Sequence, residues 1–298
     1  MPIRLAVTGL QGQVARALAE TGPVLDLEII HLGRPHLDLA APATVQPALE
    51  AAAPDIVVNA AAYTAVDQAE REPDIAATVN GVGAGSVAEA CRALGVPIIH
   101  LSTDYVFDGD KKSPYVEGDL VAPASVYGAS KLAGEKAVAA ATNDYVILRT
   151  AWVYAPYGKN FVRTMLALAE TRKEVRVVAD QVGCPTYAPE VAMAIVRIAR
   201  NLLGNPSDLQ LRGIFHLTGS GETSWAGFAS AIFASLAARG LPEPELTPIA
   251  STEYPTPARR PANSRLNCAK LARVYGIELP SWRDSLGICL ERILSPSS

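Results

Sequence analysis

A tyrosine and a lysine stand four positions apart in the run Tyr127-Gly128-Ala129-Ser130-Lys131, which opens a helix-like segment. Side chains four residues apart share one face of a helix, so these two are predicted to project together into one cleft. A free tyrosine has a pKa of about 10, and a neighbouring ammonium group favours the phenolate and lowers that pKa. The pair therefore predicts a proton donor, Tyr127, with Lys131 as its electrostatic partner.

Thr103 follows the apolar run 98–102, which is predicted to be a strand. In a doubly wound sheet the carboxyl ends of the strands form the edge at which ligands bind. When hydride reaches a carbonyl carbon, negative charge develops on the oxygen, and the hydroxyls of Tyr127 and Thr103 would both donate to it. The predicted chemistry is carbonyl reduction, with a nicotinamide as the hydride source and Lys131 on its ribose.

A glycine-rich turn follows the first predicted strand, in the run Gly9-Leu10-Gln11-Gly12-Gln13-Val14-Ala15. Its form is GxxGxxA. Glycines let the backbone approach a pyrophosphate, which then lies on the N-terminus of the next helix. An ordinary turn between strand and helix is the alternative, but the position after the first strand favours cofactor binding by Gly9 and residues 11–14.

The tip of the second predicted strand indicates which dinucleotide binds. An acid there suits the ribose hydroxyls of NAD, and an arginine suits the 2′-phosphate of NADP. The chain reads His31-Leu32-Gly33-Arg34, without an acid at the tip. We therefore predict NADPH, with NADH as the alternative, and a solvent-exposed loop charge as the other interpretation of Arg34.

Short apolar runs alternate with helix-like segments through the first half of the chain. The predicted strands are 3–8, 27–32, 56–59, 98–102 and 146–149. Such alternation predicts an α/β fold with a Rossmann-type doubly wound parallel sheet. We expect this domain to span 1–150 and to be joined by parts of 175–215, through the strand near 175–178 or its neighbours. Residues 151–298 should mainly form a smaller α/β substrate-binding domain, in which the proline-rich segment 241–261 is irregular.

Composition narrows the function classes. The 298 residues are 49% hydrophobic, which permits a sizeable core, and the net charge of −4 gives no reason to expect nucleic acid. The four cysteines form no CxxC pair and the four histidines show no zinc-binding spacing, so no metal is predicted. No uncharged apolar run reaches the ~20 residues of a membrane span, and the start lacks the pattern of a signal peptide. We expect a cytoplasmic protein.

Together these motifs resemble the extended short-chain dehydrogenases/reductases, and more closely the dTDP-4-dehydrorhamnose reductases. The similarity extends over nearly the whole chain. It is carried by TGLQGQVA (8–15), PDIVVNAAAYTAVDQAE (54–70), LSTDYVFDG (101–109), VYGASKLAGEKAV (126–138), RTAWVYAPYGKNFVRTML (149–166), DQVGCPTYAPEVA (180–192) and YPTPARRPANSRLN (254–267).

The resemblance implies reduction of the C4 ketone of dTDP-4-dehydro-β-L-rhamnose to dTDP-β-L-rhamnose, a precursor of cell-surface polysaccharide. It also implies the cofactor contacts, which are Gln11, Gly12 and Gln13 at the phosphates, Asp38 and Leu39 beside the adenosine, and Ala61, Ala62, Tyr63 and Thr64 in the cleft. Thr103 and Asp104 would meet the sugar. Trp152 would pack on the substrate, although a core aromatic at a domain seam is the alternative.

Arg259 and Arg260 are candidates for the diphosphate of the substrate. Arginine forks suit phosphate oxygens, and the neighbouring prolines could present them rigidly. A solvent-exposed loop charge is the alternative for at least one of them. Asn160 and Phe161, before a predicted helix, are further candidates of the same kind.

The resemblance leaves several alternatives open. An epimerase or dehydratase of the same superfamily would retain its nicotinamide through the cycle, and a non-catalytic regulatory subunit would not need Thr103, Tyr127 and Lys131. The identity of the nucleotide, dTDP or another, is also open. Some family members dimerise through a metal, but a full set of carboxylate ligands cannot be mapped here. The predicted partner is a dTDP-sugar, without nucleic acid or membrane, and a homodimer is left open.

Overall fold

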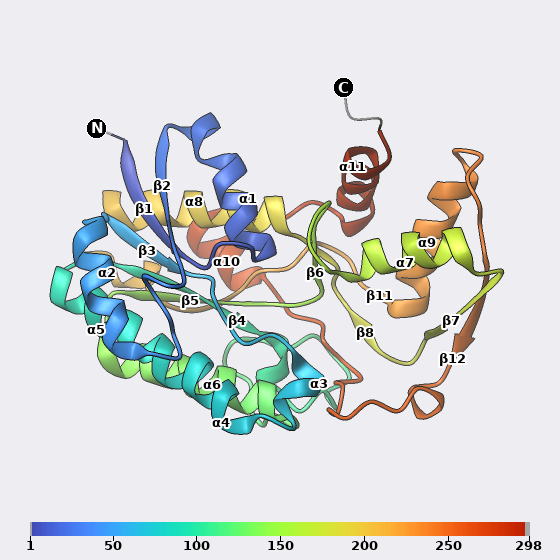
Figure 1. The fold of residues 1–298 in the computed structure, drawn as a ribbon, viewed down its shortest axis with the longest axis horizontal. Coiled ribbons are helices and arrows are strands. Elements are labelled where there is room, and N and C mark those ends of the chain that lie inside the picture. The colour runs from blue at the N-terminus through green and yellow to red at the C-terminus, as the bar shows by residue number, and fades with distance from the viewer. Residues whose placement is uncertain (1, 296–298) are drawn as a thin grey trace.

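A six-stranded, all-parallel sheet lies at the centre of the computed structural model, which describes residues 2–295 (Figure 1). Its order is β10-β5-β4-β3-β1-β2. The strands are β1 (Ile3–Thr8), β2 (Leu27–Leu32), β3 (Ile56–Asn59), β4 (Ile98–Thr103), β5 (Tyr145–Thr150) and β10 (Gly213–His216). The strand order reverses between β1 and β3, which is where a doubly wound sheet opens a crevice for a ligand. The predicted Rossmann-type fold is confirmed.

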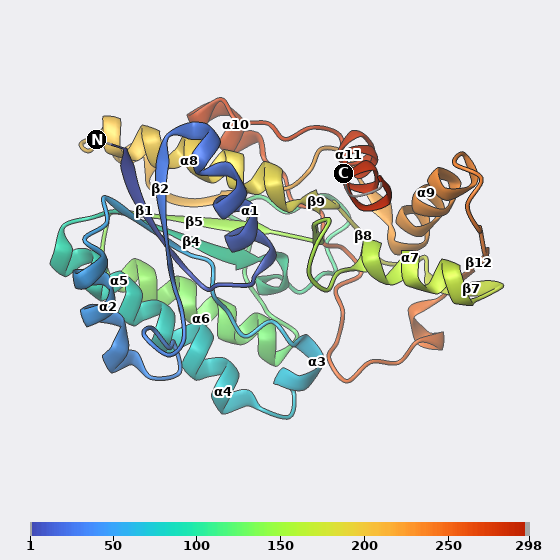
Figure 2. The same ribbon diagram turned by 45° about the horizontal axis from the view of Figure 1, so that its top comes forward.

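Helices cover both faces of this sheet (Figures 1 and 2). One face carries α1 (Gln13–Thr21), α8 (Ala188–Gly204) and α10 (Ala269–Tyr275), and the other carries α2 (Val45–Ala52), α5 (Gly83–Leu94) and α6 (Val126–Ala141). Successive strand residues point to opposite faces, so Leu5 and Val7 enter the first core and Ala6 the second. Consecutive apolar residues in the inner part of the sheet, such as 5–7 and 56–58, are thereby all buried.

Shorter elements connect these helices and strands. They are α3 (Val66–Ala69), α4 (Pro73–Ala77), a π-helical stretch (Thr78–Val82) leading into α5, and the 3-10 helices Pro23–Leu25, Pro42–Thr44, Asp104–Val106, Leu209–Leu211 and Ser251–Glu253. In the described residues 2–295, no helix is both long and apolar enough to cross a membrane.

A second core lies at one end of the sheet (Figure 2). It packs α7 (Phe161–Thr171), α9 (Trp225–Ala237) and α11 (Trp282–Leu294) against the parallel pair β7 (Glu174–Val178) and β12 (Glu245–Ile249). Two-residue strands join this core to the rest: β6 (Val153–Tyr154) pairs with β9 (Thr186–Tyr187), and β8 (Val182–Gly183) with β11 (Thr223–Ser224). Aromatic rings fill much of its interior, with Phe228 edge-on to both Tyr154 and Trp282.

Two expectations about the second half were wrong. The strand at 175–178 does not join the central sheet, because β7 pairs with β12, and the sixth strand is β10. The segment 241–261 is not wholly irregular, because it contains β12. Pro248 is tolerated in that strand since β12 has a neighbour on one side only, and a proline needs a position where no ladder N–H is required.

Candidate active site

The helix that carries Tyr127 and Lys131 is held close to the carboxyl edge of β4. Ser125 caps α6 by accepting a hydrogen bond from the Gly128 N–H at 3.1 Å. A Cβ on Gly128 would lie 2.2 Å from the Tyr105 carbonyl oxygen, so only glycine permits this approach. The helix therefore presents Tyr127, Lys131 and, one turn later, Glu135 along one face, as the spacing predicts.

Tyr127 is half-buried, and its ring meets the ring of Tyr105 edge-on with 5.4 Å between centroids. Burial raises the pKa of Tyr127 well above its usual value, the Asp104 carboxylate raises it further, and the Thr103 hydroxyl opposes the shift. The expected lowering of this pKa by Lys131 is not among the causes of the shift, and burial dominates. The consequence is a tyrosine that keeps its proton at neutral pH, as a donor must.

Lys131 is 3% exposed, and its Nζ donates to the Leu101 carbonyl oxygen at 2.6 Å. Burial lowers the pKa of Lys131 to about 8, and the Glu135 carboxylate opposes this shift. Glu135 is itself held by Arg149 through two contacts of 2.8 and 2.6 Å, and it accepts from the Ser102 hydroxyl at 2.6 Å. Lys131 is thus a fixed amine whose charge changes close to physiological pH.

Thr103 and Asp104 lie together where β4 ends. The Thr103 Oγ1 accepts from the Tyr105 N–H at 3.2 Å and donates to Asp104 Oδ1 at 3.0 Å. Burial raises the pKa of Asp104 to about 6, against hydrogen bonds from Ser264 and Thr103. Within the described residues the buried Asp104 Oδ2 has no hydrogen-bond partner. An unpaired buried oxygen is costly, and a sugar hydroxyl is a chemical group that would satisfy it.

A cavity of about 750 Å³ opens beside the switch point of the sheet. It brings together seven of the residues predicted to bind the cofactor: Gly9, Gln11, Arg34, Asp38, Leu39, Ala62 and Tyr63. Its remaining lining is mostly aliphatic, from Leu10, Leu32, Leu37, Ile75 and Val79. The combination of main chain, aliphatic walls and one arginine suits a dinucleotide with a phosphorylated ribose.

The turn at the mouth of this cavity fits a pyrophosphate. Gly9 has φ +94°, a conformation that favours glycine, and a Cβ there would lie 3.4 Å from the Cβ of Ala61. Gly12 is the N-cap of α1, with no side-chain cap on the first-turn N–H groups. Those free donors and the helix dipole are what an anion requires.

Several of the predicted cofactor and substrate contacts also have local structural roles. The Asn160 side chain caps α7, and its amide donates to Gln13 Oε1 at 3.0 Å and to the Ala155 and Tyr157 carbonyl oxygens. Gln13 Nε2 donates to the Val153 carbonyl oxygen at 3.2 Å. Val14 is buried in the core, so only its backbone can face the cofactor. Of the residues after β3, Ala61 donates its N–H to Thr8 and Thr64 is exposed.

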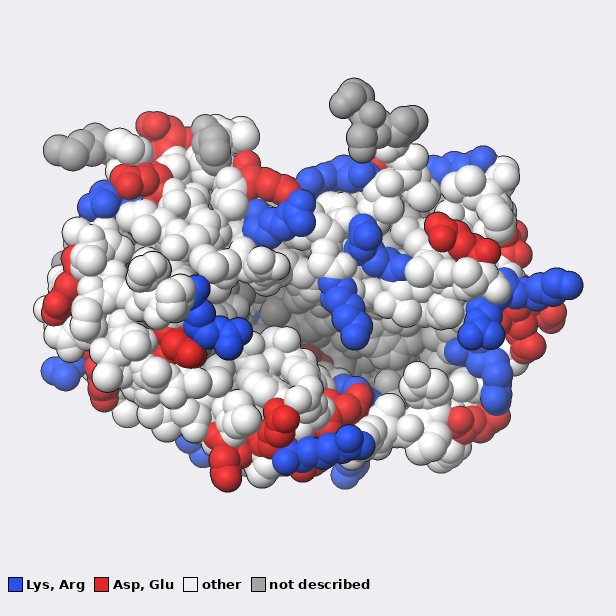
Figure 3. All heavy atoms as spheres, in the orientation of Figure 1, with Lys and Arg blue, Asp and Glu red and all other residues white. Residues whose placement is uncertain are grey.

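A second cavity, of about 440 Å³, lies between the two cores. It is lined by Arg260, Asp67 and Tyr105 on one side and by Phe161, Trp225 and residues of α7, β7 and the 250s on the other. Arg260 donates to Asp67 at 2.6 Å and to the Tyr105 hydroxyl at 3.2 Å. Figure 3 shows the molecule hollowed between its two halves, with lysines and arginines around the rim.

Of the remaining substrate-binding candidates, Arg259 lies on the surface and Trp152 lies beside the cavity residue Trp225. Arg259 lies outside this cavity, with its side chain 61% exposed and paired with Asp110 on the surface. Trp152 stacks on Trp225 with 3.5 Å between centroids, and its own φ is +50°, which is rare for a bulky residue. Such backbone strain persists where the surroundings enforce it, often at binding sites.

The sequence alone did not point to Asp67, Tyr105 or Trp225 as cavity residues. Each of the three lies in or near a sequence segment that resembles the family. Their positions in the sequence, however, do not indicate that they lie close to Arg260 or Trp152. Their proximity arises from long-range packing. The only available signal was the acid Asp67 within a segment that also carries Tyr63 and Thr64.

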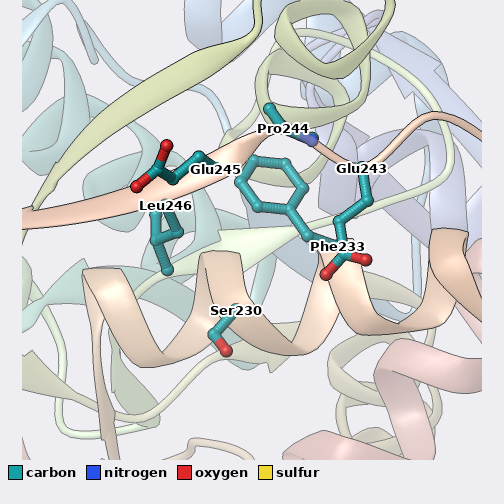
Figure 4. A pocket seen from close by; sticks show the side chains of 6 residues that line it. All are labelled: Ser230, Phe233, Glu243, Pro244, Glu245 and Leu246. Atoms are coloured by element: carbon teal, nitrogen blue, oxygen red, sulfur yellow. The ribbon is translucent and has the colours of Figure 1, made fainter.

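A third cavity, of about 360 Å³, lies between α9 and β12 (Figure 4). It is lined by Ser230, Phe233, Glu243, Pro244, Glu245 and Leu246. Two carboxylates beside an aromatic ring offer neither a cation for a phosphate nor a proton donor for a carbonyl. Across residues 2–295, no cluster of three or more His, Cys, Asp or Glu side chains has the arrangement of a metal site.

Comparison with known proteins agrees with this geometry. The RmlD substrate binding domain family matches residues 3–295. The dTDP-4-dehydrorhamnose reductase of Sinorhizobium fredii is 56% identical, with 95% of each chain covered, and that of Burkholderia thailandensis is 46% identical, with 98% of this chain and all of the relative covered. The crystal structure of dTDP-4-dehydrorhamnose reductase from Bacillus anthracis in complex with NADP is 36% identical, covers 97% of this chain and 99% of its own, and superposes with a TM-score of 0.89.

Proposed function

Because this chain belongs to the dTDP-4-dehydrorhamnose reductase family, we propose that it reduces the C4 ketone of dTDP-4-dehydro-β-L-rhamnose with NADPH, giving dTDP-β-L-rhamnose. The observation that carries this proposal is the meeting of Tyr127, Lys131 and Thr103 at the carboxyl edge of the sheet, beside a cavity suited to a dinucleotide. That edge is the ligand-binding side of a doubly wound fold.

The cofactor cavity has a residue for each part of NADPH. The backbone at Gly9 and the N-terminus of α1 would hold the pyrophosphate, and Arg34 would meet the 2′-phosphate. Asp38 and Leu39 would flank the adenosine. When bound, the nicotinamide supplies the hydride that reaches C4. The relative from Bacillus anthracis, whose structure contains NADP, supports the choice of the phosphorylated dinucleotide.

Tyr127 would give its proton to the C4 oxygen as negative charge develops there. Its raised pKa keeps the hydroxyl protonated before the reaction. Thr103 would be a second donor if its hydroxyl turned from Asp104 Oδ1, to which it donates in the empty site, toward the substrate oxygen. The loss of this proton leaves a phenolate, which a charged Lys131 on the same helix face would stabilise. The ammonium thus favours the product of proton transfer and need not lower the pKa of the resting tyrosine.

The sugar nucleotide would occupy the cavity between the two cores. Asp104 and Trp152 do not line this cavity, but each adjoins a residue that does, Tyr105 and Trp225. From there Asp104 Oδ2 would accept from a sugar hydroxyl, and Trp152 would cover the sugar ring. Arg260 would face the diphosphate, held in position by Asp67 and Tyr105. Arg259, on the surface, would not take part.

The decisive experiment measures the oxidation of NADPH and of NADH side by side with dTDP-4-dehydrorhamnose as substrate. We expect one NADPH to be consumed for each dTDP-rhamnose formed. Conversion of a nucleotide sugar without net consumption would instead indicate an epimerase or dehydratase, and an inactive protein would indicate a regulatory subunit. A strong preference for NADH would refute the assignment of Arg34.

Location and assembly belong to the same proposal. All four cysteines are unpaired, as is typical of proteins in a reducing cytoplasm, and we propose that the enzyme acts there. The homodimer stays an open alternative to the monomer, and light scattering on the purified enzyme would decide between them.

A further inference from the structure

Three polar side chains form a buried row across the central sheet. Thr8 ends β1, Asn59 ends β3, and His100 lies within β4, and each is in register with the next. None of the three is more than 1% exposed. The residues two positions earlier are apolar and belong to the core under α5 and α6: Ala6, Val57 and Ile98. A polar row in this core is costly unless its members are hydrogen-bonded to one another or serve the site.

The hydrogen bonds of this row run in one direction. The Ala61 N–H donates to Thr8 Oγ1 at 3.0 Å, and the Thr8 hydroxyl passes its own proton to Asn59 Oδ1 at 2.6 Å. The Asn59 amide then donates to His100 Nδ1 at 3.0 Å. A threonine hydroxyl can accept two hydrogen bonds, so the Ala61 N–H alone does not fix the direction of the row. The Asn59 amide fixes it, because its Nδ2 group can only donate and it faces His100 Nδ1. The network thereby assigns the imidazole proton to Nε2.

The row ends at the proposed catalytic lysine. His100 Nε2 lies 3.5 Å from Lys131 Nζ, which also donates to the Leu101 carbonyl oxygen. We propose that His100 is a positioning residue for Lys131. The row of hydrogen bonds directs the imidazole N–H at the Lys131 amine, which holds the lysine in place and disfavours its positive charge. The inference rests on the proposed function, in which Lys131 acts on Tyr127.

The electrostatics around Lys131 agree with this arrangement. Burial lowers the pKa of Lys131 to about 8, while burial and the lysine itself hold the pKa of His100 well below its usual value. The His100 ring is therefore neutral, and Lys131 is the group of this pair that can carry a positive charge. The other ionisable groups around the lysine are Tyr127 and Glu135 on α6, Arg149 on β5 and Asp104 after β4. Glu135 favours the ammonium, and in the proposed arrangement the imidazole N–H is added as a group that opposes it.

The position of the row gives it a link to the cofactor site. Thr8 immediately precedes Gly9, whose backbone forms the phosphate-binding turn, and Ala61 packs against Gly9. The donor that starts the row, the Ala61 N–H, thus lies next to the backbone that would hold the pyrophosphate.

Two substitutions of His100 test the two ring nitrogens separately, Nε2 facing Lys131 and Nδ1 facing Asn59. In His100→Gln, the side-chain amide reaches the place of Nε2 and can still donate to Lys131. In His100→Asn, the shorter amide replaces Nδ1, so it can still bond Asn59 but its donor stops short of the lysine. Both variants stay polar and bury similar groups, which makes them matched controls for each other.

The first readout is the pH profile of kcat for NADPH oxidation. Activity should fall as Lys131 loses its proton, so the alkaline limb reports the pKa of that lysine. We expect His100→Gln to keep the wild-type limb and His100→Asn to move it to higher pH by about half a unit or more, because an N–H that opposes the ammonium is gone. A limb that is unchanged or lower in His100→Asn, or that moves equally in both variants, would overturn the proposal.

The second readout needs neither cofactor nor activity. A lysine with a lowered pKa in the folded state makes the enzyme more stable as pH rises from that pKa toward the unfolded value of about 10.4. From about pH 7.5 to 9.5 the wild type should therefore gain free energy of unfolding relative to His100→Asn, but not relative to His100→Gln. If the wild type proved inactive, the proposed function would fail, and this measurement would still decide the role of His100. The absence of any pH-dependent difference would overturn it.

Discussion

The cofactor cavity and the cavity between the two cores are built in different ways. The cofactor cavity is lined by backbone and aliphatic side chains from consecutive turns at the end of the sheet, with Arg34 as its one cation. The sugar cavity is lined by aromatic and charged side chains from segments far apart in the chain, and its central contact, between Arg260 and Asp67, joins residues 193 positions apart.

This difference predicts different sensitivities. Recognition by backbone depends on conformation, so a glycine at the turn should matter more than the identity of its neighbours. Recognition by side chains depends on individual polar groups, so single truncations there should lower affinity for the sugar nucleotide without disturbing the fold. Tyr127 stands between the cavities, because it contacts Tyr105 of the sugar cavity, while Asn80 connects Ser130 of the same helix to Tyr63 of the cofactor cavity.

Loss of the Tyr127 hydroxyl should have the largest effect on activity. In Tyr127→Phe we expect kcat for NADPH oxidation to fall at least ~100-fold, because an acid at the reacting oxygen contributes about that much or more. NADPH affinity and the KM for the sugar nucleotide should change little, since the ring and its contact with Tyr105 are kept. Wild-type turnover in this variant would remove Tyr127 from the mechanism.

Asp104 should show a conflict between stability and function. Its folded-state pKa of about 6 lies above the unfolded value, so its contribution to stability is present at low pH and is lost as pH rises through about 6. Asp104→Asn should therefore exceed the wild type in free energy of unfolding by roughly 1–3 kcal/mol at neutral pH, with the gap shrinking toward about pH 4. Urea titrations across this range measure the gap.

The same Asp104→Asn variant should be a poorer enzyme. The amide cannot supply the charged acceptor that a sugar hydroxyl would meet, so we expect a higher KM for the sugar nucleotide with NADPH binding unchanged. A variant that is both less stable at neutral pH and equally active would contradict the assignment of the buried Asp104 carboxylate, with its free Oδ2, to the substrate site.

Much of the cofactor half could be predicted from the sequence because its signals are local. A strand there is one apolar run, such as 98–102, which the structure extends by one residue to Thr103. The relation between Tyr127 and Lys131 follows from helix geometry alone. The turn at Gly9 is recognisable because close approach of the backbone requires glycine, and that requirement is visible in the residue type.

The sugar half could not be predicted as well because its contacts are not local. Nothing in the sequence of β7 indicates that its partner is β12, and the proline in β12 argued against a strand. Asn160 is a candidate for the substrate diphosphate and is also the N-cap of α7, and the sequence spacing could not indicate which role an asparagine before a helix has. His100, a polar residue inside an apolar run, gave no sign of its neighbours until the register of β1, β3 and β4 was known.

Two glycines of the turn provide a direct test of recognition by backbone. Gly9→Ala should cost about 1–3 kcal/mol in the empty enzyme, because an L-residue at φ +94° is strained, and NADPH affinity should fall about tenfold or more. Gly12→Ala should leave the stability of the empty enzyme unchanged, since its φ is −62° and a Cβ there meets nothing within 4 Å. Thermal unfolding without cofactor, followed by NADPH titration, compares the two. Equal destabilisation by both variants would refute the argument.

Two neighbouring arginines test recognition by side chains, with the smallest expected effect. Arg260→Ala should raise the KM for the sugar nucleotide about tenfold, the loss expected for one charge-assisted hydrogen bond to a phosphate. Arg259→Ala is the matched control, since its exposed pair with Asp110 should contribute little. Neither change should alter NADPH affinity, because both residues lie outside the cofactor cavity. If Arg259→Ala raised the KM as much as Arg260→Ala, the diphosphate would have to lie at the surface, and the cavity between the two cores would lose its assignment.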